Sequence, residues 1–162
     1  MVLASNGGAM AAALRALQDG IAGSLSSGLH HARRDRGSGY CTFNGLAIAA
    51  GAALAAGAGT VLILDLDAHC GGGTYDLIAD NPQIWQVDVS VDRFDEYEPG
   101  VRTTLDIVGS AADYLPTIET RLREAESRRF GLCLYNAGMD PHEDCPEGAL
   151  AGVTAEQLRA RE

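Results

Sequence analysis

The sequence contains no lysine, and all twelve of its basic residues are arginine. This absence excludes a P-loop lysine, a Schiff-base lysine and a lysine general base. None of the four cysteines stands in a C-x-x-C pair, so neither a zinc ribbon nor a thioredoxin-type redox site is indicated. No run of 18 apolar residues occurs, and the first residues lack the basic and apolar regions of a signal peptide. We therefore expect a cytoplasmic protein with reduced cysteines and no membrane span.

Positive charge is scarce as well. The 22 acidic residues outnumber the 12 basic ones and give a formal net charge of −10. This balance argues against a nucleic-acid partner, which requires clustered positive charge. The length of 162 residues, 46% of them hydrophobic, is sufficient for one domain with a buried core. We expect a single domain over residues 1–162.

Helix-like and strand-like apolar patterns alternate along the chain. A helical period with Ser5 or Asn6 as candidate cap opens the sequence, and Asn44 and Ser110 are candidate caps for two later helices. Helices are predicted at residues 7–22, 44–57, 110–125 and in the tail from 154, and strands at 60–67, 84–91 and 129–138. This alternation predicts an α/β fold with a mainly parallel sheet.

The strongest chemical signal follows the first predicted strand, in the segment LILDLDAHCGGGT. Alternate residues of an extended chain share a face, so Asp65, Asp67 and His69 are expected to project together. Two carboxylates at the end of an apolar strand are costly to bury unless cations neutralise them. A divalent metal bound by Asp67 and His69 would do so, and this oxygen and nitrogen ligand set suits zinc or iron(II). Helix capping by the two aspartates is the structural alternative.

A third candidate ligand ends the last predicted strand, in the segment YNAGMDPHED. Parallel strands place their carboxyl ends along one edge of the sheet, so Asp140 is expected to meet Asp67 and His69. Two carboxylates and one imidazole, with a position left for water, are typical of a catalytic metal site.

Two of the four histidines, His30 and His31, are adjacent. Attack of water on a carbonyl needs a base to accept a proton and an acid to protonate the leaving amine. The pair is suited to those two tasks, and Asp65 could orient one imidazole through its ring N–H. One packed and one exposed histidine is the alternative, which the nearby metal-ligand pattern disfavours.

These segments together resemble the histone deacetylases and the related acetylpolyamine amidohydrolases. The resemblance lies in three ordered segments: GLHHARRDRGSGYCTFNGLAIAA, VLILDLDAHCGGGT and NAGMDPHEDCPEGALAGVT. It implies a three-layer α/β/α fold of the arginase/deacetylase type, with residues 1–162 as a partial catalytic domain and an incomplete sheet. Exposed sheet edges of this kind predict association into a homo-oligomer.

The resemblance implies a zinc-dependent amidohydrolase, with iron(II) as the alternative metal. Its substrate would be a small molecule or peptide, namely an acetylated polyamine or acetyl-lysine. Residue by residue, the metal ligands would be Asp67, His69 and Asp140, and the histidine dyad would be His30 and His31, with Asp65 behind the first histidine. Two residues, Gly39 and Tyr40, match positions that line the substrate tunnel. A structural potassium site would fall on Asp65, Asp67, His69, Ser90 and Val91.

The sequence also departs from the family pattern. After the metal-binding histidine the family usually shows His, Gly and then Asp or Asn, whereas this chain has Cys70, Gly71 and Gly72. The side chain that would steady the His31 ring is therefore expected to be absent. The family's late glycine-rich loop, with its oxyanion-binding tyrosine, has no counterpart in the 162 residues, and loss of such a donor costs about 10²–10³ in rate. We expect this chain to hydrolyse weakly or not at all.

Other functions agree less well with the sequence. A catalytically inactive metal-binding fragment or pseudoenzyme of the same family is the main alternative. A phosphatase of the D-x-D type would need a cation such as lysine near the phosphate, and it offers no role for His30 and His31.

Overall fold

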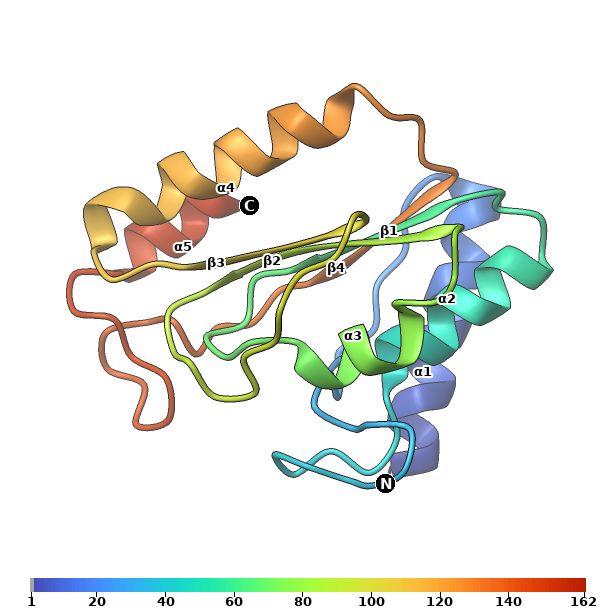
Figure 1. Ribbon diagram of the computed structural model, residues 1–162, viewed down its shortest axis with the longest axis horizontal. Coiled ribbons are helices and arrows are strands. Elements are labelled where there is room, and N and C mark those ends of the chain that lie inside the picture. Colours follow the sequence, from blue (N-terminus) through green and yellow to red (C-terminus); the bar gives the residue numbers. More distant parts are fainter. Residues whose placement is uncertain (1) are drawn as a thin grey trace.

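A four-stranded parallel sheet forms the centre of the protein in the computed structural model, which describes residues 2–162 (Figure 1). The strands are β1 (Val61–Asp65), β2 (Ile84–Ser90), β3 (Thr103–Ile107) and β4 (Leu132–Asn136). Their spatial order is β3-β2-β1-β4, and each neighbouring pair is parallel. The α/β fold with a mainly parallel sheet is thereby confirmed.

Helices cover both faces of the sheet and complete the three layers (Figure 1). One face carries α1 (Val2–Asp19), α2 (Gly45–Ala55) and α3 (Gly72–Ile78), and the other carries α4 (Ala111–Glu126) and α5 (Ala155–Arg161). None of the helices in residues 2–162 is long and apolar enough to cross a membrane.

The predicted caps of α2 and α4 are confirmed, whereas the cap of α1 was predicted wrongly. The Asn44 side chain accepts a hydrogen bond from the Ala47 amide, and the Ser110 side chain caps α4 in the same way. Helix α1 begins before both of its predicted caps, and inside it the Asn6 amide donates to the Val2 carbonyl. A side-chain amide inside a helix can donate its hydrogen bond to a carbonyl of the preceding turn. The presence of asparagine alone therefore does not mark the start of a helix.

Two short elements were not predicted from the sequence. Helix α3 has seven residues and starts with two glycines, which are poor helix formers. Strand β3 has five residues with little apolar alternation, and most of them are only partly buried at the edge of the sheet. Tertiary packing, which local patterns do not report, decides both elements.

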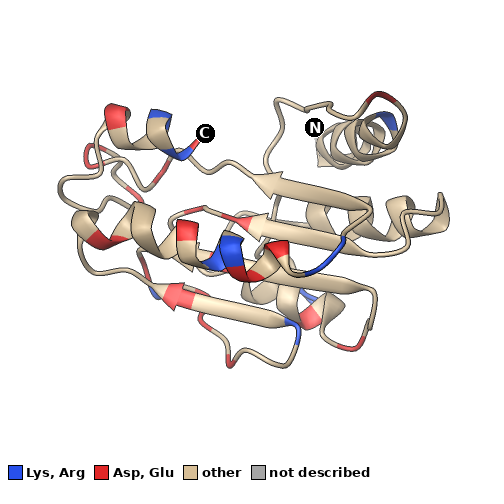
Figure 2. Ribbon diagram, turned by 90° about the horizontal axis from the view of Figure 1, so that it is seen from above, with Lys and Arg blue, Asp and Glu red and all other residues tan. Residues whose placement is uncertain are grey.

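Two hydrophobic clusters, one on each face of the sheet, hold the strands in place. All five residues of β1 are buried, as expected for a central parallel strand covered by helices. Register pairs Asp65 of β1 with Asp88 of β2, so these two carboxylates lie side by side at the carboxyl edge. Figure 2 shows acidic residues at the carboxyl ends of the strands. This edge is where the sequence predicts the functional site.

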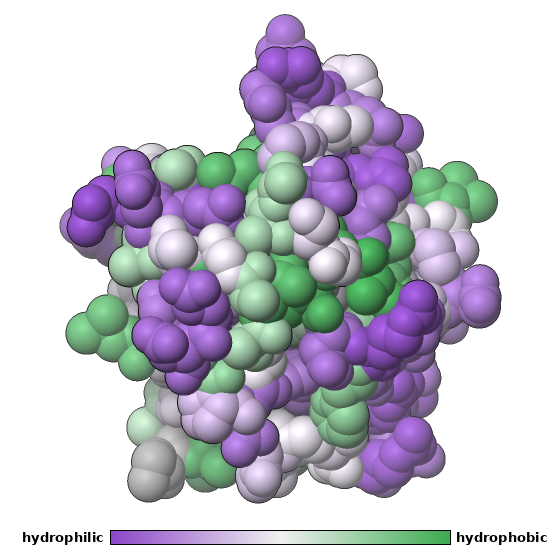
Figure 3. Space-filling view, turned by 90° about the vertical axis from the view of Figure 1, so that its left-hand side faces the viewer, coloured by the Kyte–Doolittle hydropathy of each residue, from purple (hydrophilic) through white to green (hydrophobic). Residues whose placement is uncertain are grey.

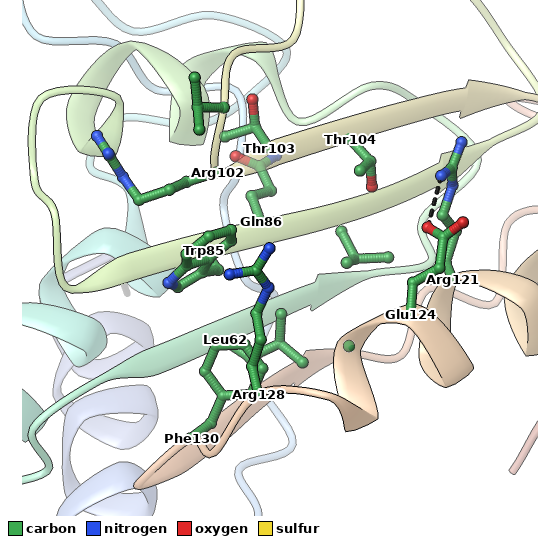
Figure 4. A pocket seen from close by; sticks show the side chains of 13 residues that line it. Leu62, Trp85, Gln86, Arg102, Thr103, Thr104, Arg121, Glu124, Arg128 and Phe130 are labelled. Atoms are coloured by element: carbon green, nitrogen blue, oxygen red, sulfur yellow. Dashed lines mark hydrogen bonds and ion pairs between the residues drawn. The ribbon is translucent and has the colours of Figure 1, made fainter.

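A cavity of about 120 Å³ opens elsewhere, between α4 and strands β2 and β3 (Figure 4). Its charged side chains already have structural contacts. The Arg121 guanidinium pairs with Asp106, and the Arg128 guanidinium stacks 3.8 Å from the centre of the Trp85 ring. The cavity lies on the face of the sheet opposite to the side chain of Asp65.

Candidate metal and catalytic site

Loops from distant parts of the chain meet at the carboxyl edge of the sheet. The segment after β1 supplies Asp67 and His69, the loop after β4 supplies Asp140, and the segment before α2 supplies His30 and His31. Open parallel sheets form their ligand sites at this edge, because the connections to the helices leave the sheet there.

The side chains of Asp67, His69 and Asp140 converge. One potential ligand atom from each lies within 4.8 Å of the others. The His69 Nδ1 atom is 3.1 Å from Asp67 Oδ1 and 3.1 Å from Asp140 Oδ2. Ligands that each lie about 2.1 Å from a tetrahedral ion are about 3.4 Å apart, so these separations are near those that a shared ion requires.

Hydrogen bonds orient the same three side chains. The His69 Nε2 atom lies 2.7 Å from the Glu147 carbonyl oxygen, so Nε2–H donates there and Nδ1 faces the two carboxylates. Asp140 Oδ1 accepts a hydrogen bond from the Ala68 amide. The contacts with Asp140 and then Asp67 raise the pKa of His69 to about 10. The two carboxylates therefore create a position that attracts positive charge, and the donor set fits a divalent metal.

The paired histidines form a hydrogen-bonded chain between two carboxylates. His30 Nδ1 lies 2.7 Å from Asp65 Oδ2, and His31 Nδ1 lies 3.0 Å from Asp95 Oδ2. The two Nε2 atoms are 3.1 Å apart. Because each Nδ1 atom faces an acceptor, both Nδ1 atoms carry protons, and the Nε2 atoms share one further proton.

This shared proton is stabilised by nearby negative charge. Burial alone would lower the pKa of His30, but Asp65 and Asp67 outweigh it and hold this pKa well above its usual value. The Nε2 atom of His30 is also 3.4 Å from Asp67 Oδ1, so it lies beside a candidate metal ligand. The pair is therefore built to hold a proton next to the place where a metal would bind.

The expectation that His31 lacks a steadying carboxylate was wrong. Asp95, in the loop after β2, supplies one although it lies 64 residues from His31 in sequence. No local motif marks this residue. The only available signal was its position just beyond the carboxyl end of the predicted strand 84–91.

The backbone of the histidine pair is fixed by α2 and α3. The Asn44 side chain donates to the carbonyl oxygens of His30 and Ala32, and the Thr74 amide donates to the His30 carbonyl at 2.8 Å. Gly73 lies so close that a Cβ atom on it would be 2.5 Å from the carbonyl oxygens of both histidines. The pair is thus held by backbone contacts as well as by its ring nitrogens.

The two predicted tunnel residues lie differently with respect to the site. Gly39 packs on the His31 ring, with a φ of +50°, and a Cβ atom there would be 2.8 Å from Cγ of His31. Tyr40 is 99% exposed, so its role as a tunnel residue stays a prediction. The Phe94 ring is half-exposed, and its centre lies 4.9 Å from the centre of the His31 ring. A hydrophobic patch bordered by hydrophilic residues is visible on this side of the molecule (Figure 3).

A second buried carboxylate lies behind Asp65. Asp88 is fully buried and accepts hydrogen bonds from the Gly71 amide at 2.7 Å and the Ser90 hydroxyl at 2.6 Å. Within residues 2–162 no arginine pairs with it, and burial together with the charge of Asp65 raises the pKa of Asp88 to about 8. Ser90, predicted as a potassium ligand, is thus engaged with Asp88, and the predicted potassium site stays a prediction.

The pKa of Asp88 leads to a testable pH dependence. A carboxyl group whose pKa is higher in the folded protein than in the unfolded chain stabilises the fold at low pH, and this contribution is lost as pH rises from about 4 to about 8. Asp88→Asn is expected to remove that loss, because an amide mimics the protonated carboxyl group. In potassium-free buffer, the variant should gain stability relative to the parent between pH 5 and pH 8, by about 1 kcal/mol or more in urea unfolding. If the difference in unfolding free energy between variant and parent were the same at pH 5 and pH 8, Asp88 would not be the group that causes the pH dependence.

Comparisons with known proteins identify similar sequences. The family model described as "Histone deacetylase domain" matches residues 1–160. Acetylpolyamine amidohydrolase 2 of Pseudomonas aeruginosa is 47% identical over 149 residues, and Histone deacetylase 2 of Arabidopsis thaliana is 34% identical over 158 residues. These alignments cover 82% and 89% of this chain but 43% and 39% of the relatives, so the chain spans half or less of their length.

Solved structures show the same likeness. The crystal structure of an acetylpolyamine aminohydrolase from Burkholderia pseudomallei superposes with a TM-score of 0.79 at 29% sequence identity. The match covers 93% of this chain and 48% of that protein.

Proposed function

The chain belongs to the histone deacetylase family, and from this premise we propose that residues 1–162 form the metal-binding part of a deacetylase catalytic domain. The reaction would be hydrolysis of the acetyl amide of acetyl-lysine or of an acetylated polyamine. The observation that carries this proposal is the convergence of Asp67, His69 and Asp140 beside a buried histidine pair. Two carboxylates and one imidazole leave a position open for water or substrate.

The residues fit zinc, with iron(II) as the alternative, through the oxygen atoms of Asp67 and Asp140 and the Nδ1 atom of His69. A bound zinc ion would polarise the amide carbonyl and lower the pKa of water. We extend the proposal to a structural potassium ion beside the predicted ligands. It would offset the negative charge of Asp65 and the charge that Asp88 acquires when it ionises, since both side chains are fully buried. The predicted ligands are Asp65, Asp67, His69, Ser90 and Val91.

The histidine pair would manage the protons of the reaction. A divalent cation bound by Asp67 would offset the negative charge that holds a proton on the pair. His30 Nε2, beside Asp67, would then be free to accept a proton from water, and Asp65 would stabilise the positive charge that results. The pair can then return a proton to the leaving amine.

The net charge also supports the proposed substrate class. A net charge of −10 attracts cationic amines, so polyamines and lysine-containing peptides would approach the site more readily than anionic amides. The absence of a nucleic-acid partner, the cytoplasmic location and the homo-oligomer stay predictions from the sequence.

Acetate release by the zinc-loaded chain tests this function. The substrates would be an N-acetylated diamine and an acetyl-lysine peptide, with His30→Ala as the test variant and Arg36→Ala, an exposed residue outside the site, as the control. We expect slow zinc-dependent release that falls by a further factor of about 10² or more in His30→Ala and is unchanged in Arg36→Ala. Equal release by His30→Ala would contradict the proposal. Tight zinc binding without any release would favour the inactive metal-binding alternative.

A further inference from the structure

His31 receives its carboxylate from a loop that the local sequence pattern does not mark. The Asp95 side chain is only 5% exposed and that of His31 only 7%, so their 3.0 Å contact is shielded from water. The Nε2 atom of His31 points the other way, toward Nε2 of His30. The two ring nitrogens of His31 thus face different partners.

Asp95 is itself held from several directions. Its Oδ2 atom also accepts a hydrogen bond from the Gly73 amide at 2.9 Å, and its Oδ1 atom pairs with the Arg33 guanidinium. Burial would raise the pKa of Asp95, but the hydrogen bonds from His31 and Arg33 outweigh it and hold this pKa below its usual value. The backbone of Asp95 has a φ of +64°, a left-handed conformation that a non-glycine residue keeps only when its surroundings enforce it.

Gly72 provides the space that this arrangement needs. A Cβ atom on Gly72 would lie 2.7 Å from Nη2 of Arg33 and 2.9 Å from Cγ of Asp95, and closer still to the Asp95 carbonyl oxygen. The volume beside residue 72 is therefore filled by Asp95 and Arg33. Any side chain at position 72 would clash with Asp95 in its observed position.

We propose that Asp95 is the positioning residue of His31. By accepting the Nδ1–H of His31, it holds the ring in the tautomer whose Nε2 atom is free to take a proton from His30 or from water. Arg33 keeps the carboxylate in place, and Gly72 leaves room for both. The effect on catalysis rests on the proposed function, whereas the effect on the tautomer does not.

Long-range ¹H–¹⁵N correlation spectra of the histidine rings test this inference. The chain has only four histidines, so each ring can be assigned by substitution. Asp95→Gly removes the carboxylate while allowing the left-handed backbone, and Asp95→Asn retains the shape of the side chain without its charge. Asp92→Asn is the matched control, because Asp92 lies in the same loop and bonds to the Phe94 amide.

In the zinc-loaded parent and in Asp92→Asn, we expect His31 to carry its proton on Nδ1 with Nε2 unprotonated. In Asp95→Gly the two tautomers should be averaged, and in Asp95→Asn the Nδ1 proton resonance should move upfield. If the parent hydrolyses acetyl amides, kcat should also fall at least about 10-fold in both Asp95 variants, with KM within about 2-fold. An unchanged His31 tautomer and proton shift in the Asp95 variants would overturn the inference. Because the spectra need no turnover, failure of the proposed hydrolysis would be recognised separately.

Discussion

Zinc affinity is expected to fall by more than about 100-fold when Asp140 is replaced by alanine. The substitution removes one of three converging ligands and leaves Asp67 and His69 with an incomplete coordination shell. It also removes the acceptor of the Ala68 amide, so the loop beside the site loses a hydrogen bond. The dissociation constant would be measured by competition with a chelator, and the metal content of the purified protein by mass spectrometry.

Two matched variants separate loss of a ligand from loss of structure. Asp140→Asn retains an oxygen for the Ala68 amide but removes the charge, so it should bind zinc weakly while remaining folded. Asp144 lies in the same loop and its side chain is 88% exposed. The Asp144→Ala variant should therefore bind zinc like the parent. Parental zinc affinity in Asp140→Ala would show that the ion is held by other residues.

Stability should decrease sharply when Gly73 is replaced by alanine. The new Cβ atom would lie 2.5 Å from the carbonyl oxygens of His30 and His31, and these are backbone atoms that cannot rotate away. Overpacking of this kind costs about 3 kcal/mol, and it would force α3 and the histidine pair apart. Urea unfolding would measure the lower midpoint, and the histidine ring spectra would report the displaced pair.

The matched control for this prediction is Gly51→Ala. Gly51 lies inside α2, and nothing is within 4 Å of a Cβ atom built there. Alanine is favoured over glycine in a helix by about 1 kcal/mol, so this variant should unfold at a higher urea concentration than the parent. A Gly73→Ala protein as stable as the parent would contradict the close packing of α3 against the histidines.

The sequence predicted most of the fold because its strong patterns are local. A continuous apolar strand at β1 and clear caps at Asn44 and Ser110 define their elements without help from the rest of the chain. Strand β3 and helix α3 lack such patterns, since one is a partly buried edge strand and the other begins with glycines. Packing against neighbouring elements determines where this helix and this strand form, and a short stretch of sequence does not reveal that packing.

The candidate site likewise has a part that the sequence predicts and a part that depends on tertiary packing. The convergence of Asp67, His69 and Asp140 was predictable, because parallel strands bring their carboxyl ends to one edge. The pairing of Asp95 with His31 was not, because it depends on a loop conformation with positive φ and on the space left by Gly72. The buried pair of Asp65 and Asp88 depends on strand register, which the sequence alone leaves open.

The position of a bound zinc ion is the most direct test of the proposed catalytic site. Anomalous diffraction at the zinc edge from crystals of the zinc-loaded chain would locate the ion. We predict one site, bound by Asp67, His69 Nδ1 and Asp140, with the His30 and His31 rings beside it. Zinc bound elsewhere, or bound through His69 Nε2 with Asp67 and Asp140 apart, would contradict the site on which the proposed deacetylase activity depends.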